Sequence, residues 1–505
     1  MKSTKLLTLV TFPLVLGGLL LYGAEIAGGL ASAAGAFEES ATLIASDGAN
    51  NDSFGNSAVI SGDTAVVGSY DDDTVAGAGA GSVYVFVRSG SIWTQVQNLT
   101  ASDGAAGDNF GYSVAMSGNT LVVGAERDDT ARGSAYVFTR IAGVWTEQQK
   151  LTASDRSGFD LFGHSVAISG ETIIAGAFGS NVPGNDDAGA AYIYTRSAGI
   201  WTQQQKLAAA DAGMQDNFGF SVGINADTVV VGAYQDDLTA GNDAGSAYVF
   251  TRTGTVWTQQ QKLTASDAAE GDFFGNSVAI SGNTIVVGAF FDDTPRGDSS
   301  GSAYVYVRSG TVWAEQQHLT ASDGASIDDF GYSVAISGNT IVVGAVGGNT
   351  TSGANSGTAY VYTRNGTIWA EQQELSASAS ASNEDFFGSA VAISENNIIV
   401  GAFFDDTAGG ENAGAASIFS SPSVSVGGKV STPSGLGLRN AVVALIDSQG
   451  VRRTATTSSF GIYAFDSVTI GETYTITVGS KRFRFASRTL QFNANASDVD
   501  FIGLE

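Results

Sequence analysis

A unit of about 56 residues recurs seven times in this chain of 505 residues, and this repeat limits the possible folds more than any other feature. A Phe-Gly pair marks each copy, and successive pairs are 56, 52, 56, 56, 56 and 57 residues apart. A glycine follows each of these phenylalanines by 14 residues, and each of the six tryptophans follows a tyrosine by nine. Such fixed spacings indicate a repeat architecture held in register by strands. The pairs begin at Phe54, Phe110, Phe162, Phe218, Phe274, Phe330 and Phe387.

Each unit predicts four short strands joined by turns. In the second unit they are expected at residues 112–117, 120–125, 134–140 and 144–154. Four antiparallel strands repeated seven times describe a seven-bladed β-propeller. A β-solenoid is the alternative, but its coils are shorter and would not carry these two fixed spacings. The prediction is therefore an all-β protein.

The ends of the repeat indicate how the ring closes. The seventh unit lacks its fourth strand, because Val426 stands where a tryptophan is due. Before the first Phe-Gly pair, residues 37–47 (FEESATLIASD) align without gaps on residues 145–155 (WTEQQKLTASD). We therefore expect the N-terminal segment to supply the missing strand, which leaves the ring without an open edge.

The chain divides into three parts. Residues 1–33 read as an export signal, with Lys2 and Lys5 before an apolar run and small residues up to Ala33. An uncleaved membrane anchor is the alternative, but that run is shorter than the roughly 20 residues a span needs. Residues 34–420 hold the propeller, and residues 423–505 form a separate tail. We expect a secreted or cell-surface protein, associated with the membrane only through its signal.

Charge and composition exclude several functions. The net charge is −27, and it belongs to the ring, which carries about −30 against +2 for the tail. A ring this acidic excludes electrostatic binding of nucleic acid. The lack of cysteine and the presence of only two histidines, His164 and His318, exclude disulfide frameworks, zinc sites and cysteine nucleophiles. Both histidines read as variation within the repeat, and no catalytic residue is predicted.

Aspartates gather in two loops that emerge on the same face of each blade: the link between blades and the connection from the second to the third strand. In one interpretation they cap loops by accepting backbone N–H groups and keep the ring soluble. In the other, carboxylates from adjacent loops converge on calcium. The candidate ligands are Asp103, Asp108, Asp128, Asp129, Asp211, Asp216, Asp236, Asp237, Asp267, Asp272, Asp292 and Asp293.

The unit resembles the FG-GAP repeats of bacterial surface proteins and, more distantly, the propeller of integrin α subunits. The resemblance rests on the pattern FG(x)SVAISG(x)TIVVGA followed by GSAYVY, and it covers about residues 37–420. It implies a propeller that binds ligands at the cell surface. One departure matters: integrin-type repeats place a calcium loop between the first two strands, where this chain has tight turns such as residues 61–64. Calcium needs six to eight oxygens, so that family site does not carry over.

The tail alternates apolar and polar residues between glycine-containing turns, as a small β-sandwich does. It resembles the carboxypeptidase regulatory-like domain of the transthyretin-like fold. Gly428, Ala441, Gly461, Phe465 and Gly471 stand where that family has its turns and core. The resemblance implies a module without catalytic activity.

These observations predict an exported or cell-surface binding and adhesion protein whose acidic face contacts a protein or a glycan. Two alternatives stay open: a secreted hydrolase acting on surface glycans through the central funnel, and a structural component of the envelope. Hydrolysis needs two distinct carboxylates, and the repeated acids single out no such pair. The tripeptide Arg296-Gly297-Asp298, which integrins read, is frequent enough by chance to be treated as coincidence.

Overall fold

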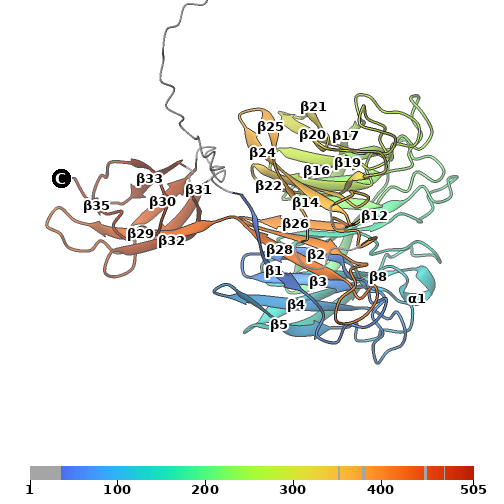
Figure 1. Ribbon diagram of the computed structural model, residues 1–505, viewed down its shortest axis with the longest axis horizontal. Helices are drawn as coiled ribbons and strands as arrows, with labels where there is room; N and C mark the ends of the chain where they lie inside the picture. The colour runs from blue at the N-terminus through green and yellow to red at the C-terminus, as the bar shows by residue number, and fades with distance from the viewer. Residues whose placement is uncertain (1–35, 351–352, 378–382, 448–451, 471–472, 505) are drawn as a thin grey trace, which may run out of the picture.

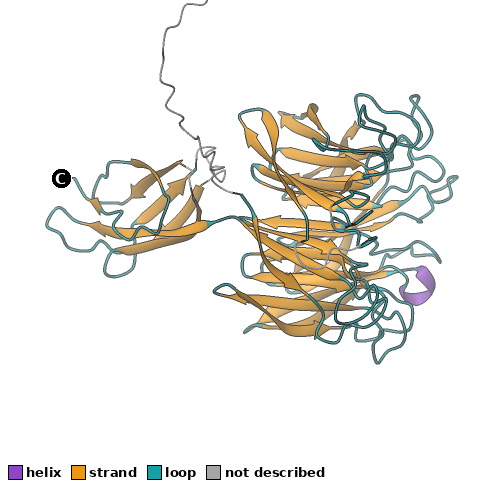
Figure 2. Ribbon diagram, viewed as in Figure 1, coloured by secondary structure: helices purple, strands orange, loops and turns teal. Residues whose placement is uncertain are grey.

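The computed structural model describes residues 36–350, 353–377, 383–447, 452–470 and 473–504. The expected export signal lies outside these residues. Seven four-stranded antiparallel sheets surround a central axis, and a smaller domain follows them (Figures 1 and 2). The predicted all-β, seven-bladed propeller is confirmed. Across the described residues one short helix occurs, α1 (Asp128–Ala131), and no helix is long and apolar enough to cross a membrane.

Each of the first six blades uses four consecutive strands. The first blade contains β2 (Phe54–Ser61), β3 (Thr64–Ser69), β4 (Ser82–Ser89) and β5 (Ile92–Leu99). The others repeat it with β6 (Phe110–Ser117), β7 (Thr120–Ala125), β8 (Ser134–Ile141), β9 (Val144–Leu151), β10 (Val166–Ser169), β11 (Thr172–Ala177), β12 (Ala190–Ser197), β13 (Ile200–Leu207), β14 (Ser221–Asn225), β15 (Thr228–Ala233), β16 (Ser246–Thr253), β17 (Val256–Leu263), β18 (Ser277–Ser281), β19 (Thr284–Ala289), β20 (Ser302–Ser309), β21 (Val312–Leu319), β22 (Phe330–Ser337), β23 (Thr340–Ala345), β24 (Thr358–Asn365) and β25 (Ile368–Leu375).

The fourth strand of the second blade ends at Leu151, three residues earlier than predicted. The reason is a bond to the next blade, in which the backbone N–H of Ser154 donates to Oε1 of Gln203 at 2.9 Å. Because this backbone N–H is bonded to the next blade, residues 152–154 belong to the link and not to the sheet of blade 2.

The Phe-Gly pair fixes the start of each blade. Phe110 is fully buried, and its ring packs edge-on against Tyr136 of the third strand with centroids 5.4 Å apart. Gly111 has φ +96°, and a Cβ atom there would lie against the carbonyl oxygen of Ser82 in the preceding blade. Only glycine permits this backbone and this close approach. The pair therefore recurs because it seats each blade on its neighbour.

The tryptophans tie neighbouring blades together at the outer strands. Gln97 donates from Nε2 to the carbonyl oxygen of Trp145 at 2.7 Å and accepts the backbone N–H of Trp145 at 3.0 Å. The guanidinium of Arg140 stacks on the Trp145 ring at 5.1 Å and donates to Oγ1 of Thr64 in the preceding blade at 2.9 Å. The tryptophans are thus structural, as their recurrence in nearly every blade predicts.

The ring closes with an N-terminal strand. Blade 7 has the strand order β1 (Glu38–Leu43), β28 (Ala415–Ser420), β27 (Asn397–Ala402), β26 (Ala390–Ser394). Strand β1 pairs antiparallel with β28, and Phe37 takes the place of the missing tryptophan. Gln373 exchanges two hydrogen bonds with the backbone of Phe37, at 2.8 and 2.7 Å, as Gln97 does with Trp145. The gapless match to residues 145–155 therefore predicted the closing strand correctly.

The tail forms two sheets around one core. Their strand orders are β32-β29-β35 and β31-β30-β33-β34, and the core between them includes Val430, Leu445, Phe465 and Ile476. The strands are β29 (Ser423–Ser431), β30 (Val442–Ile446), β31 (Arg452–Thr456), β32 (Ile462–Thr469), β33 (Thr473–Gly479), β34 (Arg488–Gln491) and β35 (Phe501–Ile502).

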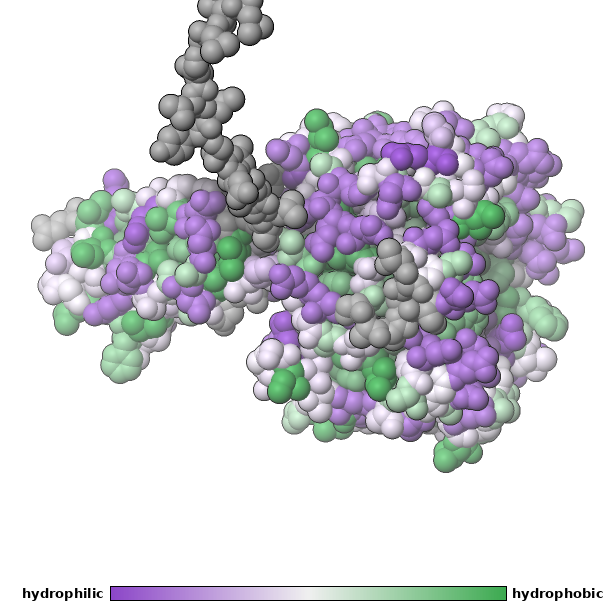
Figure 3. Space-filling model, in the orientation of Figure 1, coloured by the Kyte–Doolittle hydropathy of each residue, from purple (hydrophilic) through white to green (hydrophobic). Residues whose placement is uncertain are grey.

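The two faces of the ring differ. The links and the connections between second and third strands gather on the right in Figure 1, around α1, whereas the small domain lies on the left. We call the first of these the long-loop face. Hydrophilic residues cover much of the visible side of the ring (Figure 3). The connections between first and second strands are tight turns, so the calcium loop of integrin-type repeats is absent from the described blades.

Candidate functional site

On the long-loop face, blades 2, 4 and 5 each bring two aspartates to the tyrosine of the third strand. In blade 2 the Tyr136 hydroxyl donates to Asp103 of the link at 2.8 Å, and it lies 3.1 Å from Asp128 of the loop. Nζ of Lys150, on the fourth strand, lies 2.8 Å from Asp103 and 2.5 Å from Asp128. We call this arrangement the rim cluster. Two of the predicted ligands do converge, and in this blade an ammonium group stands between them.

Blade 4 repeats the arrangement with Lys262 between Asp211 and Asp236, at 2.8 and 2.6 Å. Burial alone would raise the pKa of the Asp211 carboxyl, but hydrogen bonding and charge from Lys262 outweigh it and hold that pKa below its usual range. Burial would likewise lower the pKa of Lys262, but the two carboxylates raise it. The lysine therefore offsets one of the two negative charges in the position where a bound cation would lie.

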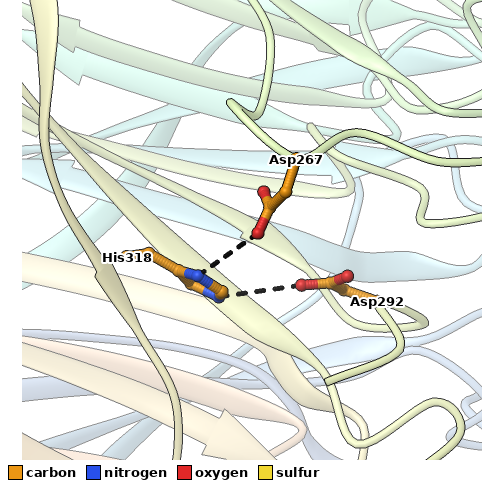
Figure 4. A group of neighbouring side chains, drawn as sticks. All are labelled: Asp267, Asp292 and His318. Carbon is orange, nitrogen blue, oxygen red and sulfur yellow. Dashed lines mark ion pairs between the residues drawn. The ribbon is translucent and has the colours of Figure 1, made fainter. Parts of the chain in front are cut away.

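Blade 5 differs, because His318 stands at the lysine position (Figure 4). Its Nδ1 lies 3.5 Å from Asp267, and its Nε2 lies 3.7 Å from Asp292 and 2.6 Å from Oγ of Ser302. The imidazole stacks on Tyr304 with centroids 4.6 Å apart. Asp292 is 5% exposed, and burial raises its carboxyl pKa.

The blade 5 group consists of side chains that can ligate a divalent cation, and its three ligand atoms lie within 4.8 Å of one another. Sequence reasoning gave His318 no role and excluded zinc, and here the structure differs from that expectation. Two carboxylates and one imidazole resemble the three-ligand sets of zinc more than the six to eight oxygens of calcium. Calcium binding stays a prediction, and within the ring blade 5 is the place to test it.

The remaining predicted ligands hold loops. In six of the links the second aspartate is buried and accepts the backbone N–H of the residue three positions earlier, as Asp108 does from Ala105 at 2.7 Å. Asp237 and Asp293 accept a backbone N–H six residues later, and Asp129 pairs with arginines. Burial raises the pKa of Asp216 and Asp272 to about 6. These contacts fit the interpretation of the aspartates as loop caps.

A second feature of this face lies at the centre of the ring and was not predicted. Most of the residues that line the opening of the central channel occupy two positions of the repeat, the residue after Phe-Gly and the residue after the second strand; Phe273 and Gln235 stand next to such positions. They enclose a cavity of about 500 Å³, which we call the channel mouth. It is lined by Tyr112, His164, Phe220, Tyr234, Gln235, Phe273, Asn276, Phe290 and Tyr332.

The rings of the channel mouth touch one another in an unbroken arc over six blades. The arc runs from Tyr70 to Tyr332, and the centroids of successive rings lie between 4.3 and 5.8 Å apart. Tyr332 keeps 37% of its surface exposed. Aromatic side chains around an open cavity are typical of small-molecule sites, whose volumes run from about 300 to 1,000 Å³.

Two ionisable groups belong to this region. His164, a member of the arc, is buried, and its Nδ1 lies 2.7 Å from Oε2 of Glu126. Asp329, beside Tyr332, occupies the position that Phe273 has in the previous blade, and burial followed by the charge of Asp328 raises its pKa to about 7. His164, interpreted from the sequence as variation within the repeat, is therefore part of the channel mouth.

The sequence contains a signal for the channel mouth. The residue after Phe-Gly reads Asn, Tyr, His, Phe, Asn, Tyr and Ser through the seven repeats, while its neighbours barely change. In a ring whose other positions repeat, the positions that vary between blades are those that can make an asymmetric site.

The family comparison agrees with the repeats of the fold. The FG-GAP repeat family matches residues 37–86, 93–138, 145–194, 201–250, 257–306, 313–362 and 369–419. No curated protein matches the chain. Among solved structures, a candidate 6-phosphogluconolactonase from Bacteroides uniformis is similar at 13% identity and a TM-score of 0.43, over 66% of this chain and 88% of that one. Since the matched repeats span more than half of its length, the chain belongs to the FG-GAP repeat family.

Proposed function

We propose that the protein is exported and acts at the cell surface as a binding or adhesion module, with the long-loop face as its contact surface. FG-GAP propellers are often involved in binding or adhesion, which supports this class of function. The channel mouth is the observation that carries the proposal. It is a preformed cavity on the face where the long loops gather, and preformed concave sites bind at a lower cost in ordering.

The aspartates support this role indirectly. As loop caps and as partners of Tyr136, Lys150 and their equivalents, they hold the long loops in one arrangement around the mouth. Their summed charge repels anionic ligands and favours neutral or cationic ones. The acidic rim thus selects what approaches the mouth without itself being the contact.

We assign the small domain a spacer or docking role, consistent with its resemblance to carboxypeptidase regulatory-like modules. It follows blade 7 directly and lies on the side of the ring away from the long loops (Figure 1). Attachment through this domain would leave the channel mouth facing outward.

The test is a binding screen of the purified protein against immobilised glycans and matrix proteins. Phe220→Ala/Tyr332→Ala removes two rings of the mouth, and Phe460→Ala removes a ring on the small domain that is 76% exposed. We expect the wild-type protein and the Phe460 variant to bind the same ligand and the double variant to lose it. A ligand retained equally by all three proteins would show that contact is made elsewhere.

One observation favours a hydrolase as the second candidate. The Asp329 carboxyl, with a pKa of about 7, could donate a proton at neutral pH as a general acid does. Glycoside hydrolysis also needs a second carboxylate, and Glu126, the other carboxylate of this region, is engaged by His164. Release of reducing sugar from surface glycans by the wild-type protein, and its loss in Asp329→Asn, would favour the enzyme over the binding module.

A further inference from the structure

We propose that the channel mouth binds a single pyranose ring of a neutral glycan, stacked against the aromatic arc. This inference rests on the proposed binding function and names the chemistry of its ligand. The geometry comes first: Phe220, Tyr234 and Phe273 are successive members of the arc, with centroids 4.3 and 5.4 Å apart. Together they present apolar surface to a cavity of about 500 Å³.

The aromatic arc is not simply the part of the hydrophobic core that lies nearest the channel. The core between blades is formed by the conserved positions of the repeat, such as Phe218 and Tyr248, which are fully buried. Phe220 and Tyr234 lie outside that cluster and are only partly buried. Because the arc surrounds open space and changes from blade to blade, packing alone does not account for it.

Apart from His164, which pairs with Glu126, the polar groups that line the mouth are neutral. Within the described part of the chain, the hydroxyls of Tyr112, Tyr234 and Tyr332 have no hydrogen-bond partner. Burial raises the pKa of Tyr112 and Tyr234, so both hydroxyls stay protonated. Gln235 accepts a hydrogen bond from Asn217 through Oε1, which leaves its Nε2 amide available. These tyrosine and glutamine side chains therefore offer uncharged donors and acceptors to a ligand.

These features together fit a sugar ring. A pyranose has an apolar C–H face that packs on aromatic rings and a rim of hydroxyls that both donate and accept. The residues that line the mouth include no lysine or arginine to pair with an anionic ligand, and the acidic ring repels such a ligand. A cation could lie over the ring faces, but neither Asp329 nor Glu126 is among the residues that line the cavity. The neutral sugar satisfies both the apolar and the polar groups.

Saturation-transfer NMR on the purified protein tests this inference. The probes are methyl β-D-glucoside, methyl β-D-galactoside, methyl α-D-mannoside, a methyl glucuronide, tetramethylammonium and N-acetylphenylalanine amide. We expect at least one neutral glycoside to receive saturation on its ring C–H protons, and the glucuronide to bind more weakly. The proposal would be overturned if tetramethylammonium or the phenylalanine derivative bound and no glycoside did. It would also be overturned if none of the probes bound.

Variants locate the site and distinguish a loss of binding from a loss of folding. Phe220→Ala/Tyr332→Ala should weaken glycoside binding at least 10-fold, while Phe460→Ala should leave it unchanged. Tyr234→Phe removes one oxygen and keeps the ring, so it should weaken binding by about 2- to 10-fold without changing the melting temperature. If none of these variants changed glycoside binding, the placement of the glycoside in the channel mouth would be refuted. If the double variant loses a macromolecular ligand while no glycoside binds, the proposed function stands and this inference fails.

Discussion

Strand β1 seals two blade interfaces, and removing its two anchors should open the ring. Phe37 is 7% exposed and packs with Val400 and Phe419, between blades 6 and 7. Leu43 is 3% exposed and packs with Phe54 and other residues between blades 7 and 1. We therefore predict that Phe37→Ala/Leu43→Ala destabilises the ring strongly.

The magnitude follows from burial. Truncating a buried phenylalanine to alanine costs about 3–5 kcal/mol, and truncating a buried leucine costs about 2–5 kcal/mol. The two residues stand six positions apart on one strand, roughly 20 Å, so their effects should add. The sum of about 5–10 kcal/mol approaches the whole stability of a typical domain. For a ring of about 385 residues, each kcal/mol lowers the melting temperature by about 1.2 °C, so we expect a fall of about 6–12 °C.

Thermal unfolding followed by circular dichroism measures this shift. Glu38→Ala, on the exposed side of the same strand, is the matched control and should stay within about 0.5 kcal/mol of the wild type. A melting temperature for the double variant within 2 °C of the control would refute the closing role of β1. Deletion of residues 37–46 is the stronger perturbation and should lead to aggregation through the exposed edge of β28.

Three further predictions concern charge, metal and domain boundaries. The folded ring holds protons on Asp216 and Asp272 up to about pH 6, whereas the unfolded chain releases them near pH 4, so stability should fall as the pH rises from about 4 to 6. The melting temperature should accordingly be higher at pH 5 than at pH 7, and a variant with asparagine at both positions should show a smaller difference; an equal difference would contradict this. Zinc, and millimolar calcium as the weaker candidate, each compared with sodium chloride at equal ionic strength, should raise the melting temperature through Asp267 and Asp292 and have no such effect on a variant with asparagine at both; curves that coincide with sodium chloride for both metals would argue against a metal site. Residues 423–505 should unfold cooperatively when expressed alone, and a non-cooperative transition would place the boundary elsewhere.

The sequence predicted the ring well because the ring is periodic. Phe110, Gly111 and Trp145 each do the same work in nearly every blade, so spacing alone indicates their role. The closing strand was also predictable, since residues 37–47 still match the fourth strand of other blades.

The channel mouth could not be predicted in this way. Tyr112, His164 and Phe220 stand at one position of three successive repeats, and a difference between repeats reads as variation until the ring brings those positions together. The roles of the aspartates were ambiguous for a related reason. Whether Asp103 caps, pairs or ligates depends on Lys150, which is 47 residues away in the chain.

The closing strand has a consequence for the order of folding. Ser40 bonds to Ile418 across 378 residues, so β1 leaves the ribosome long before its partner β28. At about 5–20 residues per second, the interval is roughly 20–75 s. During this interval β1 has no partner strand, and an unpaired strand edge can pair with another copy of the chain and start aggregation. Glu38 and Glu39 place two negative charges at the start of this strand, and like charges discourage two waiting copies from pairing with each other. The segment that completes the last blade thus also carries the charges that protect the chain from aggregation until that blade has folded.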